Sequence, residues 1–119
     1  MTAIHFGIAL LCVLAISIGQ VLFKRTGLQI ETTGTVYDSR VLLSGLGAML
    51  LYAGASLLWI YLLRFVELKF AYPIMALSFV ITPLLAHLLL SEKIGAQYLL
   101  GMALIIAGIL VITRTAISP

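Results

Sequence analysis

The sequence predicts an all-α protein in which four transmembrane helices form one bundle over residues 1–119. Hydrophobic residues make up 63% of the chain and charged residues only 9%, whereas a soluble domain has about 25% charged residues. Four apolar stretches of about 20 residues are each long enough to cross the hydrocarbon core of a bilayer. None of them alternates between apolar and polar residues, which argues against a membrane β-barrel.

The four predicted spans cover residues 4–23, 41–63, 70–90 and 94–113. Charged residues follow every span: Lys24 and Arg25, then Arg64, then Glu92 and Lys93, and finally Arg114. The first span is not expected to be a cleaved signal peptide, because no basic segment precedes it. Residues 26–40 are rich in turn-forming residues and predict a polar loop at the membrane surface. The other connections are short, so the helices themselves must carry the function.

Basic residues do not select an orientation for the bundle. An even number of spans places Lys24, Arg25, Arg40 and Lys93 on one face of the membrane and Arg64, Lys69 and Arg114 on the other. Four cations against three is a weak positive-inside signal. It permits one fixed orientation, and it equally permits insertion in both orientations and an antiparallel pair.

Several function classes are excluded by composition and by missing motifs. The net charge of +3 is spread along the chain, with no basic cluster larger than Lys24 and Arg25, so no nucleic-acid partner is expected. The single Cys12 lies inside an apolar run and is expected to be a small buried residue. No metal-ligand spacing, nucleophile–base pair or nucleotide-binding loop occurs, so we expect no enzymatic activity, metal or cofactor.

Polar residues inside the first span share one helical face. Ser17, Gln20 and Lys24 follow an i, i+3, i+7 pattern that ends in a cation near headgroup depth. This face suits an anionic lipid headgroup, because the amide of Gln20 both donates and accepts hydrogen bonds and Lys24 adds a positive charge. The alternative is that Gln20 bonds a neighbouring helix while Lys24 only extends to the interface.

In the second span, Tyr52 lies near mid-membrane, where its hydroxyl needs a polar partner, so it is a better candidate for a substrate contact than Trp59 and Tyr61 near the span's end. In the third span, Pro83 removes a backbone hydrogen bond and predicts a kink beside Ser78. His87 could titrate near neutral pH, but it lies close enough to the span's end to be a neutral, hydrogen-bonded ring.

The fourth span has small residues on one side. Gly101 and Gly108 are seven residues apart, which keeps both on one face of a helix where a partner backbone can approach closely. A bundle of this size has little room for a substrate cavity of its own. Both points favour a dimer.

The last two spans resemble the drug/metabolite transporter superfamily, whose small multidrug resistance and EamA-type members end a helix with a polar or acidic pair before a glycine-rich helix. The matching residues run from Leu88 to Ile94 and from Gly101 to Ile112. The chain length and the four spans are similar to the small multidrug resistance branch, which works as dimers. That branch carries a membrane-buried glutamate in its first helix, where this chain has Ile16, so the resemblance does not imply proton-coupled drug export.

A nearer resemblance is to the small subunits of flippases that move aminoarabinose-phosphoundecaprenol, a lipid-linked sugar used in lipid A modification. The similar residues are Gly19 and Gln20 followed by Lys24, and Ala71, Tyr72 and Pro73 followed by Leu77, Ser78 and Phe79. This resemblance implies a lipid flippase of the bacterial inner membrane, whose partners are membrane lipids and a second copy or a similar small subunit.

Residues and resemblance together predict a dimer that moves a polyprenyl-phosphate-linked monosaccharide across the membrane. Lys24 would hold the phosphate and Pro83 would permit a tilt, while Gly101 and Gly108 would pack the dimer. The side chains expected to bind the sugar are Ser17, Gln20, Tyr52, Tyr72 and Ser78. Two alternatives stay open: an exporter of small cations or metabolites that uses His87 or another subunit's acid, and a non-transporting subunit that stabilises a partner.

Overall fold

The computed structural model describes residues 2–117, with side chains described as far as Arg114. These residues form the helices α1 (Ala3–Thr33), α2 (Ser39–Leu63), α3 (Leu68–Met75), α4 (Ser78–Leu90) and α5 (Ala96–Ile117), and no strand. Four segments are long and apolar enough to cross a membrane, because α3 and α4 together make one span, Leu68–Leu90. The predicted all-α fold with four spans is confirmed.

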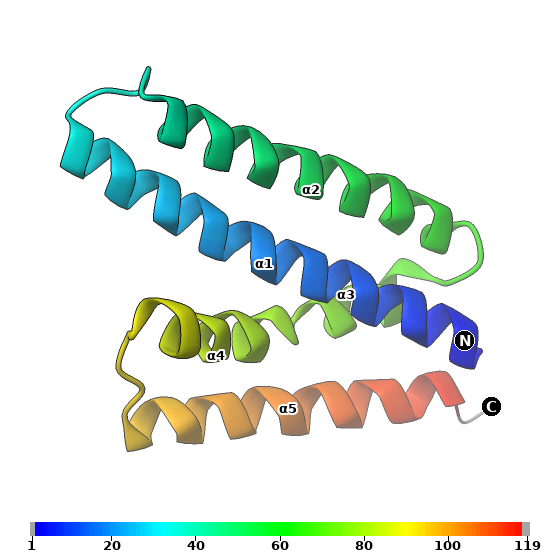
Figure 1. The fold of residues 1–119 in the computed structure, drawn as a ribbon. Coiled ribbons are helices and arrows are strands. Elements are labelled where there is room, and N and C mark those ends of the chain that lie inside the picture. Colours follow the sequence, from blue (N-terminus) through cyan, green and yellow to red (C-terminus); the bar gives the residue numbers. More distant parts are fainter. Residues whose placement is uncertain (1, 118–119) are drawn as a thin grey trace.

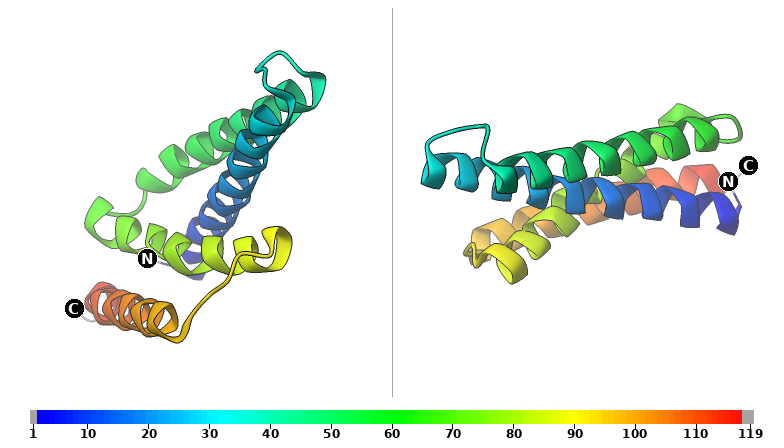
Figure 2. Two further views of the ribbon diagram at one scale, coloured as in Figure 1. Left: turned by 90° about the vertical axis from the view of Figure 1, so that its left-hand side faces the viewer. Right: turned by 45° about the horizontal axis from the view of Figure 1, so that its top comes forward.

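The helices lie side by side in the spatial order α2, α1, α3 with α4, and α5 (Figure 1). The hairpin of α1 and α2 crosses the second hairpin at an angle, which gives the molecule an open V shape in one view (Figure 2). Its principal extents are 55 × 36 × 17 Å, so it is a slab about one to two helices thick. Because the slab is thin, most helices keep a face that no other part of the chain covers.

α1 is longer than the sequence predicted. The prediction of a loop over residues 26–40 was wrong for its first part, because the helix continues to Thr33. It ends at Gly34, whose φ of 74° suits a glycine. The hydroxyls of Thr32 and Thr33 donate to the carbonyls of Leu28 and Gln29, which satisfies them within the helix. Turn-forming residues can therefore stay helical when their side chains bond to the preceding turn.

Small residues bring α1 and α2 close together. Ala48 and Ala55 of α2 are buried, and so is Gly19 of α1, which lies against Tyr52 of α2. Cys12 is fully buried, with its sulfur 3.8 Å from the carbonyl oxygen of Ala55, in agreement with its expected place as a small interior residue. A contiguous apolar core lies near the N-terminal end of α1 and joins α1 and α2 to α3 and the turn before it. Its buried residues are Ala9, Val13, Leu62, Val66, Ala71 and Ile74.

The third span is interrupted before the predicted kink. Its helical hydrogen bonding breaks between Met75 and Ser78, where the amide of Leu77 bonds to the carbonyl of Ile74, three residues back instead of four. Pro83 lies inside α4, and the helix continues through it to Leu90. The tight turn at residues 76–77 thus separates a short α3 from α4, nearly two turns before the proline.

Candidate functional site

A cavity of about 360 Å³ lies where α1, α4 and α5 meet. α1 contributes Ile16 and Gln20, which are four residues apart and therefore on one face of the helix. The remaining lining residues are Ser78, Phe79, Thr82 and Pro83 of α4 and Tyr98 of α5. The cavity thus combines amide and hydroxyl groups with apolar and aromatic surface, and none of its lining residues is charged.

Gln20 is held at the cavity by the neighbouring helix. Its side-chain amide donates a short hydrogen bond to the hydroxyl of Tyr52 on α2. The Tyr52 ring stacks on Phe23 with 5.1 Å between ring centroids, and it lies directly against Gly19. Only a glycine leaves room for the ring there, since a Cβ atom at position 19 would be 2.6 Å from a ring carbon. Tyr52 therefore positions Gln20.

Two further cavities adjoin this one. The first has about 520 Å³ and is largely apolar; it is lined by Phe79, Gln97, Tyr98, Gly101, Met102 and Ile105. The second has about 270 Å³ and reaches the end of α4; it is lined by Thr82, Pro83, Ala86, Glu92, Lys93, Ile94 and Tyr98. Tyr98 borders all three, so the hollow region runs along α4 and α5 from an apolar section to a charged rim.

Some of the predicted site residues come together here and some do not. Gln20, Ser78 and Pro83 line the central cavity, and Tyr52 contacts Gln20. Lys24 is exposed one turn beyond Gln20, and it forms no ion pair within residues 2–114. Ser17 is fully buried, its hydroxyl has no hydrogen-bond partner among the described residues, and it lines none of these cavities. Tyr72 is 66% exposed and also lies outside them.

The predicted glycine face of α5 is open. A Cβ atom at Gly101 or at Gly108 would meet nothing within 4 Å, so no other part of the described chain needs these glycines for its packing. Gly101 borders the apolar cavity, whereas Gly108 lies one heptad further along the helix. The two glycines are thus available to a partner helix.

Sequence reasoning missed Tyr98, Phe79 and Ile16 as lining residues. Tyr98 stands at the start of the last span, where an interfacial aromatic residue would be expected in any membrane helix. Phe79 and Ile16 look like ordinary apolar residues. Ile16 could have been found, because it occupies the position at which the small multidrug resistance branch has its buried glutamate, and the structure places that position in the cavity wall.

His87 is part of the helix end. Its Nδ1 lies 2.7 Å from the carbonyl oxygen of Glu92, and Ser91, with a φ of 57°, closes α4 in the left-handed conformation. The ring lines none of the cavities along α4 and α5. The part of the chain that the structure describes holds no group of three or more His, Cys, Asp or Glu residues that could bind a metal.

The sequence matches the model of the EamA-like transporter family over residues 1–114. A relative from Salmonella paratyphi C is 33% identical over 111 residues, covering 92% of this chain and 98% of the relative. A relative from Pseudomonas aeruginosa strain UCBPP-PA14 is 41% identical over 68 residues. That match spans 56% of this chain and 59% of the relative. Both are named as the probable 4-amino-4-deoxy-L-arabinose-phosphoundecaprenol flippase subunit ArnE.

A third relative with the same name, from Pseudomonas fluorescens, is 38% identical over 60 residues, which is 50% of this chain and 53% of the relative. The chain thus spans little more than half of the two Pseudomonas relatives and nearly all of the Salmonella one. No solved structure matches the chain.

Proposed function

This chain belongs to the EamA-like transporter family, and from that premise we propose that it flips a polyprenyl-phosphate-linked monosaccharide of the aminoarabinose type across the bacterial inner membrane. The relatives named as flippase subunits for such a lipid support this choice of substrate. The structural observation that carries the proposal is the uncharged polar cavity beside Lys24, which continues into an apolar one.

The cavity offers the chemistry that a sugar needs. Its volume of about 360 Å³ lies within the range of about 300–1,000 Å³ that is usual for small-molecule sites. The amide of Gln20 and the hydroxyls of Ser78 and Thr82 can bond sugar hydroxyls, and the ring of Tyr98 can pack on an apolar sugar face. Tyr52 orients Gln20, whereas Ser17 and Tyr72 do not line this cavity.

In this substrate the phosphate joins the sugar to the prenyl chain, so both would leave the cavity on the Lys24 side of the sugar. Lys24 projects toward headgroup depth one turn beyond Gln20, where its ammonium group can bond the phosphate. The prenyl chain continues from the phosphate, so it would lie in lipid outside the cavities. None of the residues that line the central cavity is acidic, so the cavity adds no negative charge close to the phosphate.

A dimer, formed with a second copy or with a similar small subunit, would complete the passage. The slab is only 17 Å thick, so one copy cannot surround a sugar on all sides. The open glycine face of α5 supplies a surface for a second copy or a similar subunit, because Gly101 and Gly108 allow close helix contact. In the tilting step, the tight turn at residues 76–77 and Pro83 would let the two halves of the third span move against each other.

Native mass spectrometry of the gently solubilised protein tests this proposal. The protein is offered polyprenyl phosphate with one aminoarabinose unit, the same polyprenyl phosphate without sugar, and bulk phospholipid. A dimer that retains the sugar-bearing lipid in preference to the bare polyprenyl phosphate is the expected result. Retention of bulk phospholipid alone would contradict it and would favour a subunit that only stabilises a partner.

A further inference from the structure

A separate hollow of about 230 Å³ lies between the C-terminal end of α1 and the N-terminal end of α2. Its lining residues are Arg25, Leu28, Gln29, Thr32, Thr33 and Arg40. Two of them carry a positive charge and none is acidic. The hollow shares no lining residue with the cavities along α4 and α5.

The hollow begins where the apolar part of α1 ends. With 31 residues, α1 is about 46 Å long, which exceeds the hydrocarbon core of about 30 Å by roughly 16 Å. The apolar part of α1 ends at Phe23, so Arg25 follows it by about 3 Å along the helix axis, at the depth of lipid phosphates, and Gln29 and Thr33 follow it by about 9 and 15 Å. Arg25 follows Gln20 by five residues and so points about 140° around the helix from it. The hollow is therefore on a different face of α1 from the central cavity.

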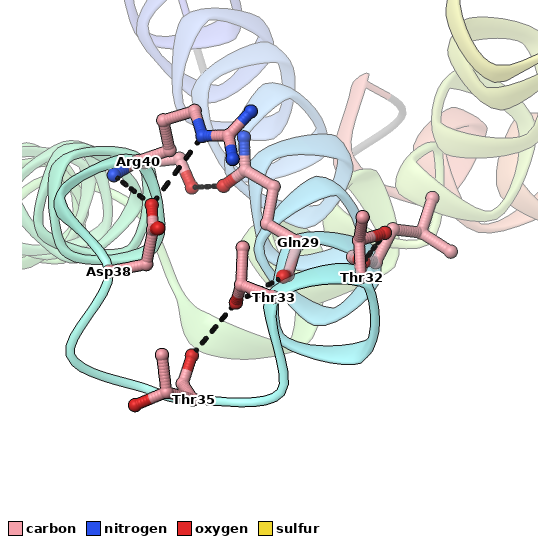
Figure 3. Close-up of polar contacts among 8 residues, drawn as sticks. Gln29, Thr32, Thr33, Thr35, Asp38 and Arg40 are labelled. Carbon is pink, nitrogen blue, oxygen red and sulfur yellow. Dashed lines mark hydrogen bonds and ion pairs between the residues drawn. The ribbon is translucent and has the colours of Figure 1, made fainter.

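The polar groups at this hollow can donate hydrogen bonds to an anion. Asp38 holds Nε of Arg40 at 3.5 Å, and the two terminal amino groups of the guanidinium have no partner in the part of the chain that the structure describes (Figure 3). Arg25 forms no ion pair within residues 2–114. The hydroxyl of Ser44 donates to Oε1 of Gln29 at 2.9 Å, and this bond leaves the amide nitrogen of Gln29 as a further donor.

The threonines and the leucine complete the wall without adding negative charge. The hydroxyls of Thr32 and Thr33 donate to backbone carbonyls of α1 at 2.9 and 2.7 Å, so they are already satisfied. Leu28 is 42% exposed and gives the hollow an apolar side. An anion that also carries acyl chains would use both the arginines and the leucine, whereas a free ion would use only the arginines.

We propose that this hollow binds the phosphate group of an anionic phospholipid, held by Arg25 and Arg40 and bordered by Leu28, as a lipid site separate from the transport cavity. Two guanidinium groups from adjacent helices match the oxygens of one phosphate group. A bound lipid would tie the protruding end of α1 to the start of α2. The proposal does not depend on which lipid the cavity transports.

The test uses the full-length chain in mild detergent, with dioleoyl phosphatidylglycerol as the probe and native mass spectrometry as the readout. Replacing both arginines, as R25Q together with R40Q, should weaken retention of the phosphatidylglycerol at least about tenfold. The matched control replaces Arg64→Gln and Lys69→Gln, which removes the same charge at the opposite end of the bundle and should change retention less than about twofold. Equal losses in the two variants would overturn the proposal, because they would reflect net charge alone.

Two further measurements keep the test decisive. Dioleoylglycerol, which has the same acyl chains and no phosphate, should be retained far less than phosphatidylglycerol; equal retention would show that the phosphate is not recognised. Excess inorganic phosphate should not displace the lipid, and displacement would assign the hollow to a free anion instead.

The variants R25K and R40K replace the double variant if it loses helicity by circular dichroism. They keep the charge but lose the bidentate geometry, and about a threefold loss of phosphatidylglycerol retention is expected from each. Retention by both lysine variants equal to that of the unchanged chain would then count against the site.

Discussion

The ring of Tyr52 on α2 lies so close to Gly19 on α1 that a Cβ atom at position 19 would be 2.6 Å from Cε2 of the tyrosine. The same ring stacks on Phe23, and its hydroxyl accepts a hydrogen bond from Gln20. Because Gly19 has no side chain, Tyr52 of α2 can approach α1 and hold the amide of Gln20 in place. This arrangement couples the packing of α1 and α2 to the wall of the central cavity.

Gly19→Ala is expected to push the Tyr52 ring away and to separate it from Gln20. We expect a loss of about 1–3 kcal/mol in the free energy of unfolding, as for other overpacked sites, together with weaker binding of the lipid-linked sugar. Thermal unfolding in detergent measures the first effect. Gly27→Ala is the control on the same helix, because a Cβ there meets nothing within 4 Å. That control should be neutral or stabilising by about 0.5–1 kcal/mol, so equal melting temperatures for both variants would contradict the packing argument.

Tyr52→Phe keeps the ring and removes the hydroxyl that positions Gln20. We expect binding of the lipid-linked sugar to fall about two- to tenfold, in line with the loss of one hydrogen bond of about 0.6–1.5 kcal/mol, while the melting temperature changes little. Titration of the lipid followed by native mass spectrometry measures the change. Tyr61→Phe, which removes a hydroxyl near the end of α2, should bind normally. Normal binding by Tyr52→Phe as well would mean that this hydroxyl does not prepare the site.

The order and number of spans were predictable because apolar stretches separated by charged residues leave few alternatives in a membrane. The extension of α1 to Thr33 was not, since Thr32 and Thr33 are turn-forming residues by composition. They are helical here because their hydroxyls bond to carbonyls of the preceding turn. The sequence shows that these residues are threonines, but only the structure shows which group each threonine hydroxyl bonds.

The site was predictable in part for a similar reason. Gln20 and Ser78 stood out because polar residues are rare in these spans, and both line the central cavity. Tyr72 stood out equally and is 66% exposed, since a single sequence does not show which face of α3 meets another helix. Tyr98 borders three cavities only because the connection after α4 returns α5 alongside it, a tertiary relation that periodicity cannot show.

Gly108→Leu is expected to separate the subunits of a dimer without unfolding either of them. A Cβ atom at position 108 would meet nothing within 4 Å in the described part of one copy, but a leucine there would keep a partner helix from approaching. Native mass spectrometry should show mainly monomer for this variant. Gly54→Leu on α2, where the space is equally open, should remain dimeric. A dimer that persists in Gly108→Leu would place the interface on another face.

Lys24→Ala tests the proposed phosphate contact. Because a charge-assisted hydrogen bond contributes about 1.5–3 kcal/mol, its loss should weaken binding of the lipid-linked sugar roughly tenfold or more. Lys24→Arg should retain most of the binding. Lys69→Ala, which removes a lysine at the other membrane face, should behave like the unchanged chain. Unchanged binding in Lys24→Ala would remove this lysine from the mechanism.

Ile16→Glu tests whether the central cavity is adapted to an anionic substrate. Ile16 and Gln20 lie on the same wall, so a carboxylate at position 16 would stand in a poorly solvated site close to the bound lipid. The test uses a lipid-linked sugar without an amine, because a protonated amine near position 16 would attract the carboxylate. Like charges about 12 Å apart at an effective dielectric constant of about 20 repel by about 1.4 kcal/mol, so we expect binding of this lipid to fall about tenfold. Ile16→Gln has nearly the same shape without the charge and should lose less than about threefold. The ratio between the two variants isolates the charge from the change in packing. Equal binding by Ile16→Glu and Ile16→Gln would show that the phosphate does not approach this part of α1, and the substrate would then have to enter from another side of the bundle.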